Sequence, residues 1–243
     1  VACVLLTLWI VRQLRKNPGF VRTAIALTAA VGCLHGLFFI GSGRFYGSGG
    51  SFLRDRALAG YDSIAFPGED EDEFFRLDLY NALDNLGLYW HVPNIQAFHS
   101  IVPNSIMEFY PYVGVKRDVS SKPEVNNYAL RPLLSVKYLA ASPSEKAEKL
   151  MPGFHFSFSQ FGYDFYENEN YLPMGFGYTT GVRQSVLDTA PLSLRSNVML
   201  EAVGLSDEAM DRNADFLSEM ESIDYSALNT DGMEEAVEER RQY

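Results

Sequence analysis

The stretch "TAIALTAAVGCLHGLFFIG", Thr23 to Gly41, decides how the chain is organised. It contains no aspartate, glutamate, lysine or arginine across 19 positions. A helix of this length, rising about 1.5 Å per residue, is about 28 Å long, which is close to the roughly 30 Å hydrocarbon core of a bilayer. We therefore interpret residues 23–41 as a transmembrane helix. A buried helix of a soluble protein and a signal peptide are the alternatives, but a signal peptide has a shorter apolar region and does not follow another apolar run.

A second apolar segment, "VACVLLTLWIV" at residues 1–11, is too short to span a bilayer. We interpret it as the end of a truncated transmembrane helix. Residues 12–22, "RQLRKNPGFVR", are predicted to form a purely basic cytoplasmic loop, because short basic loops stay on that side of a membrane. The following helix therefore runs outward. This orientation predicts a multi-pass protein of the cell membrane with residues 44–243 extracytoplasmic.

The part of the chain after the apolar segments is strongly acidic. Residues 44–243 contain 16 of the 20 basic residues and all 31 acidic residues, a formal net charge of −15. This charge disfavours nucleic acid and an anionic membrane surface as partners, so the bilayer around the helices is the expected lipid contact. Both cysteines, Cys3 and Cys33, lie in the apolar segments. The acidic part must therefore be stabilised by packing alone.

The acidic part is predicted to be an α+β domain. A Gly/Ser-rich linker covers residues 42–50, the extracytoplasmic domain covers residues 51–222, and an acidic tail covers residues 223–243. The tail is expected to be frayed, or to be helical only together with a remainder of the chain that is missing here. Alternating apolar residues predict strands at residues 75–79, 136–140 and 154–158. Capping residues and apolar spacing predict helices at residues 106–112, 130–134, 143–150 and 206–222, and a helical stretch from Val186 to Val203.

Aromatic and amide side chains concentrate within one short region, at Tyr89, Trp90, His91, Asn94 and His99. Flat rings and amides contact the apolar face and the hydroxyls of a sugar, so these residues are candidates for substrate binding. Packing in the core of the domain is the alternative, and residue type alone favours it. The two histidines lack the third histidine or the cysteine of a zinc site. The acidic run "GEDEDE" at residues 68–73 lacks the ligand spacing of an EF-hand, so we predict no metal site and no cofactor.

His35 is a polar ring inside the predicted transmembrane helix. It is expected to face either a hydrogen-bonding partner helix or a polar cavity, such as a groove for a lipid carrier. No catalytic base can be assigned, because Asp62, Asp78, Asp84 and Asp164 have no distinguishing spacing. No nucleotide-binding motif is present either, and a lipid-linked donor does not need one.

The segment "YENENYLPMGFGY", Tyr166 to Tyr178, reads neither as a clean strand nor as a clean helix. Pro173 lacks a backbone N–H and favours an extended Leu172, so a strand is expected to end near this point. Gly175 and Gly177 permit close approach of backbone or ligand. We predict an architectural element here, with a substrate-facing lip as the alternative.

Three stretches together carry a resemblance to a known family. They are "FFRLDLYNALDNLGLYWHVPNIQAFHSIVPNSIMEFYPYVGV" at residues 74–115, "LRPLLSVKYLAAS" at residues 130–142, and "YENENYLPMGFGY". In this order, after an outward-running helix, they resemble the outer, C-terminal part of the bacterial YfhO membrane protein family. The resemblance covers about residues 20–205.

The resemblance implies a multi-spanning glycosyltransferase of the GT-C type. Such an enzyme transfers a sugar from a polyprenyl-phosphate carrier to a cell-envelope polymer such as teichoic or lipoteichoic acid. Enzymes of this type place their catalytic acid in the first outer loop, which this chain is expected to lack, so the catalytic residues stay unknown. The alternative is a non-catalytic, membrane-tethered module for envelope binding or assembly.

Overall fold

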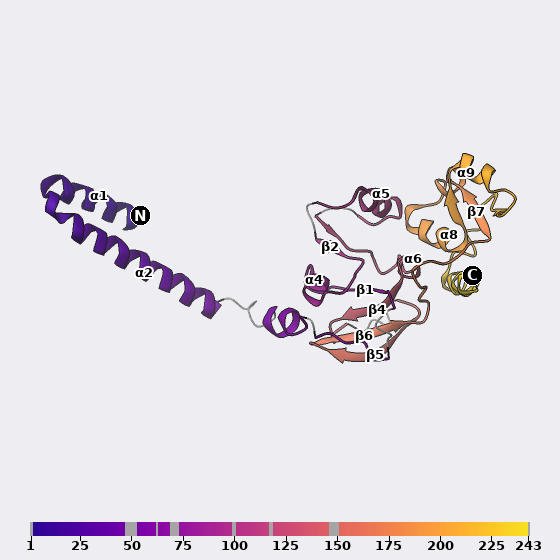
Figure 1. Ribbon diagram of the computed structural model, residues 1–243, viewed down its shortest axis with the longest axis horizontal. Coiled ribbons are helices and arrows are strands. Elements are labelled where there is room, and N and C mark those ends of the chain that lie inside the picture. Colours follow the sequence, from indigo (N-terminus) through magenta and orange to yellow (C-terminus); the bar gives the residue numbers. More distant parts are fainter. Residues whose placement is uncertain are drawn as a thin grey trace. The chain divides into compact units, whose positions relative to one another are not determined.

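The computed structural model describes residues 2–46, 53–61, 63–68, 73–98, 101–116, 119–145 and 151–242. The chain divides into two compact units, Val1–Leu53 and Arg54–Tyr243. The first unit is a pair of helices and the second is a mixed α/β domain (Figure 1). The predicted order of a helical segment followed by a domain of helices and strands is therefore confirmed.

The first unit is a hairpin of α1 (Ala2–Lys16) and α2 (Val21–Tyr46), joined by the short helical turn η1 (Pro18–Phe20). The side-chain oxygen of Asn17 accepts a hydrogen bond from the Gly19 N–H at 3.0 Å and caps this turn. Most of the segment predicted as a loop, residues 12–22, is thus helical. Arg15 and Lys16 occupy the last turn of α1, where positive charge interacts favourably with the helix dipole. These basic residues are therefore compatible with a helix up to Lys16.

The second helix of the hairpin is longer than expected. It continues through residues 41–46, which the glycine and serine content assigned to a linker. No proline interrupts this segment, and the Ser42 hydroxyl donates to the Phe39 carbonyl at 3.1 Å within the helix. Among the described residues, one helix, Pro18–Phe45, is long and apolar enough to cross a membrane.

The main sheet of the second unit has the strand order β1-β4-β6-β5. β1 runs parallel to β4, whereas β4 pairs with β6 and β6 with β5 in antiparallel fashion. The strands are β1 (Arg76–Asp78), β4 (Val136–Ala141), β5 (Phe154–Gln160) and β6 (Tyr163–Asn168). Three of these four strands, β1, β4 and β5, lie where alternating apolar residues predicted them.

Two smaller sheets complete the strand content of the described residues. One is an antiparallel ribbon of β2 (Ala97–Phe98) and β3 (Ser120–Ser121). In the other, β7 lies between β8 and β9 and is parallel to both. Its strands are β7 (Thr180–Arg183), β8 (Val203–Leu205) and β9 (Ser218–Glu219).

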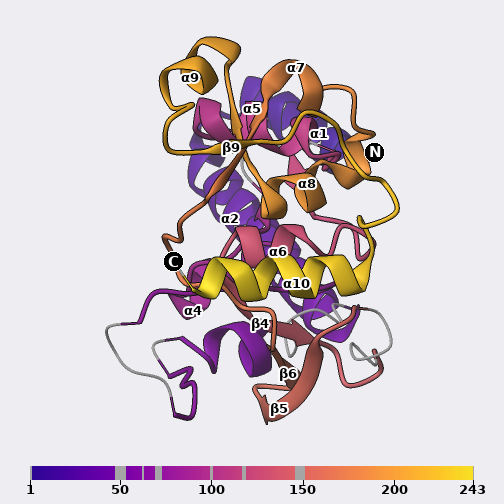
Figure 2. The same cartoon turned by 90° about the vertical axis from the view of Figure 1, so that its right-hand side faces the viewer.

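Short helices connect and cover these sheets (Figures 1 and 2). They are η2 (Leu53–Leu58), α4 (Leu86–Trp90), α5 (Asn104–Tyr112), α6 (Leu130–Leu133), α7 (Gln184–Leu187), η4 (Leu192–Leu194), α8 (Arg195–Glu201), α9 (Asp207–Arg212) and α10 (Thr230–Arg241). The helices predicted at residues 106–112 and 130–134 are confirmed as α5 and α6. The helix predicted at residues 143–150 lies largely outside the described residues.

Two helix predictions in the C-terminal region are wrong. The helix predicted at residues 206–222 ends at Arg212, because the Asn213 side chain donates to the Ala209 carbonyl at 2.8 Å and β9 then pairs with β7. Val203 belongs to β8 and not to a helix. Strand pairing over a distance outweighs local helical spacing in both places.

The tail expected to be frayed contains the longest helix of the second unit among the described residues. Asn229 caps α10 by accepting from the Gly232 N–H at 3.0 Å. Met233, Ala236 and Val237 then recur at helical spacing and are buried against α8 and the neighbouring core (Figure 2). Buried apolar contacts stabilise this acidic segment, and its net charge gives no indication of them.

A fully buried ion pair lies at the centre of the second unit. Asp78 of β1 and Arg131 of α6 are both 0% exposed, and Arg131 Nη2 lies 2.8 Å from Asp78 Oδ2. Arg131 also donates from Nε to Oδ2 at 3.0 Å and from its two Nη atoms to the carbonyls of Pro123, Glu124 and Asn127. Every N–H of the guanidinium therefore has a partner, as a buried charge requires.

The network around this pair extends to other elements. The second carboxylate oxygen of Asp78 accepts from the Gln96 side chain at 3.0 Å, and Asn127 joins α8 through a hydrogen bond from Ser196. Burial, with the Asp78 carboxylate as a second cause, raises the pKa of Tyr110 to about 12. The Tyr110 phenol therefore stays protonated and donates to the Ile95 carbonyl. β1, α5, α6 and α8 are connected by buried polar contacts.

The segment Tyr166 to Tyr178 joins the main sheet to the C-terminal helices. Leu172 is fully buried beside Met233 and Val237, and the Tyr178 phenol donates to the Met199 carbonyl at 2.6 Å. Arg240 donates to the Gly177 carbonyl at 3.2 Å from the opposite side. These contacts agree with the predicted architectural element, and β6 ends at Asn168 before Pro173, as expected.

We predict that Asp78→Asn destabilises the second unit by about 3–5 kcal/mol, because it leaves Arg131 charged and unpaired in the core. Unfolding of the purified chain in urea, followed by the fluorescence of buried Trp90, measures this change. Asp84→Asn is the control, since the Asp84–Lys122 pair at 3.1 Å is exposed and should contribute about 0–1 kcal/mol. Equal effects of the two variants would contradict a special role for the buried pair.

We also predict that Leu172→Ala costs about 2–5 kcal/mol, because it opens a cavity between the Tyr166–Tyr178 segment and α10. Met174→Ala, two residues away in the same segment, removes a side chain that is 66% exposed and should cost no more than about 0.5 kcal/mol. The same urea titration compares them. A small effect at both positions would show that this segment is not a structural joint.

Candidate functional site

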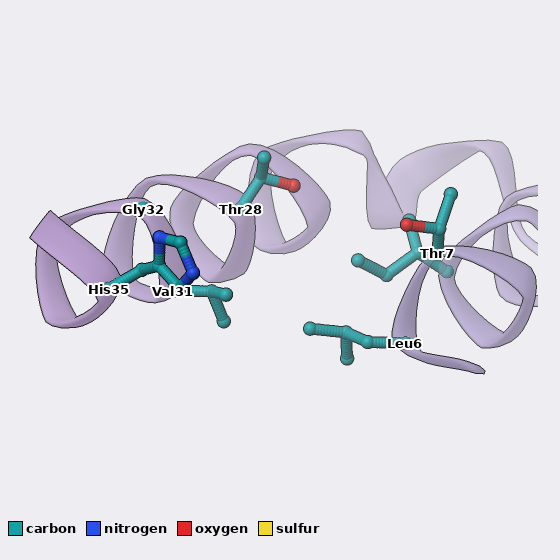
Figure 3. A pocket seen from close by; sticks show the side chains of 7 residues that line it. Leu6, Thr7, Thr28, Val31, Gly32 and His35 are labelled. Atoms are coloured by element: carbon teal, nitrogen blue, oxygen red, sulfur yellow. The ribbon is translucent and has the colours of Figure 1, made fainter. Parts of the chain in front are cut away.

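The helix hairpin of the first unit carries an open cavity between its two helices, lined by polar and apolar side chains. Its volume is about 280 Å³. α1 contributes Leu6, Thr7 and Ile10, and α2 contributes Thr28, Val31, Gly32 and His35. Figure 3 shows the His35 ring and the Thr28 side chain on α2, with Leu6 and Thr7 across the gap on α1. The cavity thus combines a titratable ring with the apolar side chains of a membrane-type helix pair.

The position of His35 in this cavity follows from helix spacing. Thr28, Gly32 and His35 lie four and three residues apart, so they share one face of α2. Gly32 has no heavy atom within 4 Å of the place where a side chain would begin, so it leaves room beside the imidazole. The His35 ring also packs on Phe39, with ring centroids 4.6 Å apart. His35 was a candidate from the sequence analysis, and the same helical spacing is the signal that could have identified Thr28 and Gly32.

An apolar cavity of about 510 Å³ adjoins the first towards the turn of the hairpin. The two cavities share Ile10 and Thr28. The second is lined otherwise by Leu14, Val21, Ala24, Ile25 and Ala29. The hairpin therefore carries a slot that is apolar near the turn and has an imidazole at its far end. A long hydrocarbon chain with a polar head group matches this distribution of side chains.

The predicted sugar-binding residues of the second unit do not form one site. Trp90 is 1% exposed and belongs to the core, where its ring packs on Tyr163 and Phe165 and its N–H donates to the Arg56 carbonyl at 3.2 Å. Tyr89 is half-buried against the same core. Both residues therefore pack in the core, which was the alternative to sugar binding in the sequence analysis.

Of the remaining members of that group, the structure describes His91 and Asn94. His91 is exposed and packs edge-on against Tyr61, with ring centroids 4.8 Å apart. Asn94 is half-buried, and its side-chain oxygen accepts from the Gln96 N–H at 3.0 Å. His99 lies outside the described residues. Of the four described candidates, His91 is exposed, Tyr89 and Asn94 are half-buried and Trp90 is buried.

The four candidate bases also occupy different surroundings. Asp78 is committed to the buried ion pair with Arg131. Asp84 pairs with Lys122 at the surface, and Asp164 accepts from the Ser159 hydroxyl at 2.5 Å. Asp62 lies outside the described residues. Of the three described aspartates, Asp78 is bonded in the core and Asp84 and Asp164 have partners at the surface, so none is singled out as a general base.

A metal centre is not formed by the described part of the chain. No group of three or more histidine, cysteine, aspartate or glutamate side chains there is arranged to hold an ion. Glu73, at the end of the acidic run, bonds the Lys137 ammonium at 2.8 Å. Most of that run, residues 69–72, lies outside the described residues.

Comparison with known proteins gives one match. The family model described as "Bacterial membrane protein YfhO" matches residues 56–242. No curated protein and no solved structure matches the chain. The matched region contains all three stretches on which the resemblance was based, and it extends through α10 to the end of the described residues. The chain therefore belongs to the bacterial YfhO membrane protein family.

Proposed function

We propose that this protein takes part in glycosyl transfer at the outer face of a bacterial cell membrane. In this proposal a sugar passes from a polyprenyl-phosphate carrier to a cell-envelope polymer of the teichoic or lipoteichoic acid type. The hairpin contributes to the binding of the carrier, and the second unit contacts the acceptor polymer. Family membership gives the membrane setting, and the GT-C chemistry is an expectation from the resemblance.

The observation that carries the proposal is the slot of the hairpin. An isoprenoid chain is a long hydrocarbon, and the larger cavity offers it apolar walls. The phosphate of the carrier needs a hydrogen-bond donor, and the His35 imidazole stands at the other end of the slot. A polar ring among apolar helices is costly, so a functional partner for it is the simplest physical reason for its presence.

The proposed orientation agrees with this arrangement. With the basic turn of the hairpin on the cytoplasmic side, the larger apolar cavity lies in the cytoplasmic half of the bilayer and His35 lies in the outer half. The outer side is also the side on which the second unit is proposed to be. A carrier phosphate at the level of His35 would therefore lie in the half of the bilayer nearer to the compartment in which envelope polymers are extended.

We predict that His35→Ala lowers sugar transfer at least tenfold, because the carrier phosphate loses a hydrogen-bond donor in an apolar site. Membranes that contain the protein are incubated with a radiolabelled polyprenyl-phosphate sugar, and label in the polymer fraction is counted. Leu34→Ala is the matched control, since Leu34 is adjacent, 67% exposed and outside the cavity. The proposal would be refuted if membranes with the unmodified protein transferred no more sugar than membranes without the protein.

Sidedness is tested separately. We expect a protease tag after Tyr243 to be cut in intact cells and a tag beside Lys16 to be protected, since the proposal places the second unit outside and the basic turn inside. Permeabilised cells provide the control in which both tags are cut. The reverse pattern in intact cells would exclude an extracytoplasmic second unit.

A further inference from the structure

A groove beside the β2–β3 ribbon of the second unit combines polar side chains with an exposed aromatic ring. It consists of an open hollow of about 400 Å³ and a narrow inner hollow of about 10 Å³, which has room for one water molecule. Phe98, Ser120 and Lys122 line both hollows. The inner hollow adds Asp84, Asn94 and Gln96, and the open one adds Lys116 and Glu124. Among the described residues, two that were considered from the sequence line this groove: Asn94 as a substrate contact and Asp84 as a base.

The ring of Phe98 is held at the surface by its backbone. The side chain is 43% exposed although the residue lies in a strand. Asn85 bonds both polar groups of the Phe98 backbone, because its amide donates to the Phe98 carbonyl at 3.1 Å and its oxygen accepts from the Phe98 N–H at 3.3 Å. Ser120 of β3 lies opposite Phe98 in the ribbon. The ring is therefore positioned before any ligand arrives.

The inner end of the groove is fixed by the core. Gln96 donates through its side chain to Asp78 Oδ1 at 3.0 Å, and its backbone N–H donates to the Asn94 side chain. Gln96 is thereby attached to the buried Asp78–Arg131 pair. Amide groups at this position cannot rotate freely, so they present their remaining hydrogen-bonding capacity in fixed directions.

The charges that line the groove balance. Asp84 and Lys122 form a pair at 3.1 Å, and their side chains are 44% and 41% exposed. The other two charged residues, Lys116 and Glu124, are of opposite sign. Two carboxylates and two ammonium groups in one groove do not favour a phosphate or a divalent cation. They do offer acceptors and donors at close spacing, which suits a neutral ligand with several hydroxyl groups.

We propose that this groove binds a neutral sugar ring. The apolar face of the ring packs on Phe98, and its hydroxyls bond Asp84, Lys122 and the neighbouring amides. The proposal rests on the proposed function in one respect, since the sugar would belong to the acceptor polymer. It assigns acceptor contact to the residues that line the groove, Asp84, Asn94, Gln96, Phe98, Ser120 and Lys122, and not to Trp90 or Tyr89.

Binding is tested with the full chain in lipid nanodiscs and three neutral tetrasaccharides, maltotetraose, cellotetraose and chitotetraose, by saturation-transfer NMR. We expect saturation of ring protons of at least one probe, and a loss of affinity of tenfold or more in Phe98→Ala and in Asp84→Asn. Phe98→Tyr keeps an aromatic face and should bind within about threefold of the unmodified chain. Inorganic phosphate at the same concentration should not compete.

Phe216→Ala is the matched control, because Phe216 is 81% exposed and lies outside the groove. Equal losses in Phe216→Ala and Phe98→Ala, competition by phosphate, or the absence of binding by all three probes would each overturn the proposal. Sugar transfer that persists in the membrane assay while no probe binds would refute the groove and leave the proposed function standing. The absence of sugar transfer in the membrane assay, together with normal probe binding, would refute the proposed function and leave sugar binding by the groove standing.

Discussion

The buried pair of Asp78 and Arg131 is the constraint on which the second unit depends. A guanidinium without access to water is tolerated only when each of its N–H groups is bonded, and here the carboxylate takes two bonds and three carbonyls of residues 123–127 take the rest. This requirement fixes the path of the chain before α6 and the position of α6 against β1. Apolar contacts alone would fix neither so narrowly, since they are not directional.

The hairpin obeys a different constraint. The backbone groups of α2 bond within the helix, which stays helical through residues 41–46 although their composition is typical of a linker. Most side chains of this helix are apolar, so His35 is an exception that needs a reason. The slot supplies one, because it groups the imidazole with Gly32 and Thr28 on the face of α2 that meets α1. A histidine placed on the lipid-facing side would have no such neighbours.

Sequence patterns predicted the elements whose stability is local or whose apolar residues alternate cleanly. Strands β1, β4 and β5 and helices α5 and α6 are of this kind. Strands β7 to β9 were missed because each is short and is stabilised by parallel partners distant in sequence. α10 was missed because Met233, Ala236 and Val237 stand among acidic residues that dominate the composition. For the site, His35 was identifiable from its apolar context. Trp90 was predicted to bind substrate but is buried, whereas Phe98 was not singled out and is exposed. Burial depends on the path of the whole chain and not on residue type.

The groove and the buried pair are connected through one residue, Gln96. Gln96 lines the groove and also bonds Asp78, so the geometry of the groove is tied to the most strongly determined part of the core. A loop alone, free to move on its own, would have to be ordered by the ligand and would lose affinity to that ordering. In this protein the residues at the inner end of the groove are already ordered when the chain has folded. The same connection means that a change at Asp78 alters both stability and the groove, whereas Asp84 and Phe98, which face solvent, report on the groove alone. Residues at the surface of the groove are therefore the ones that can separate binding from folding.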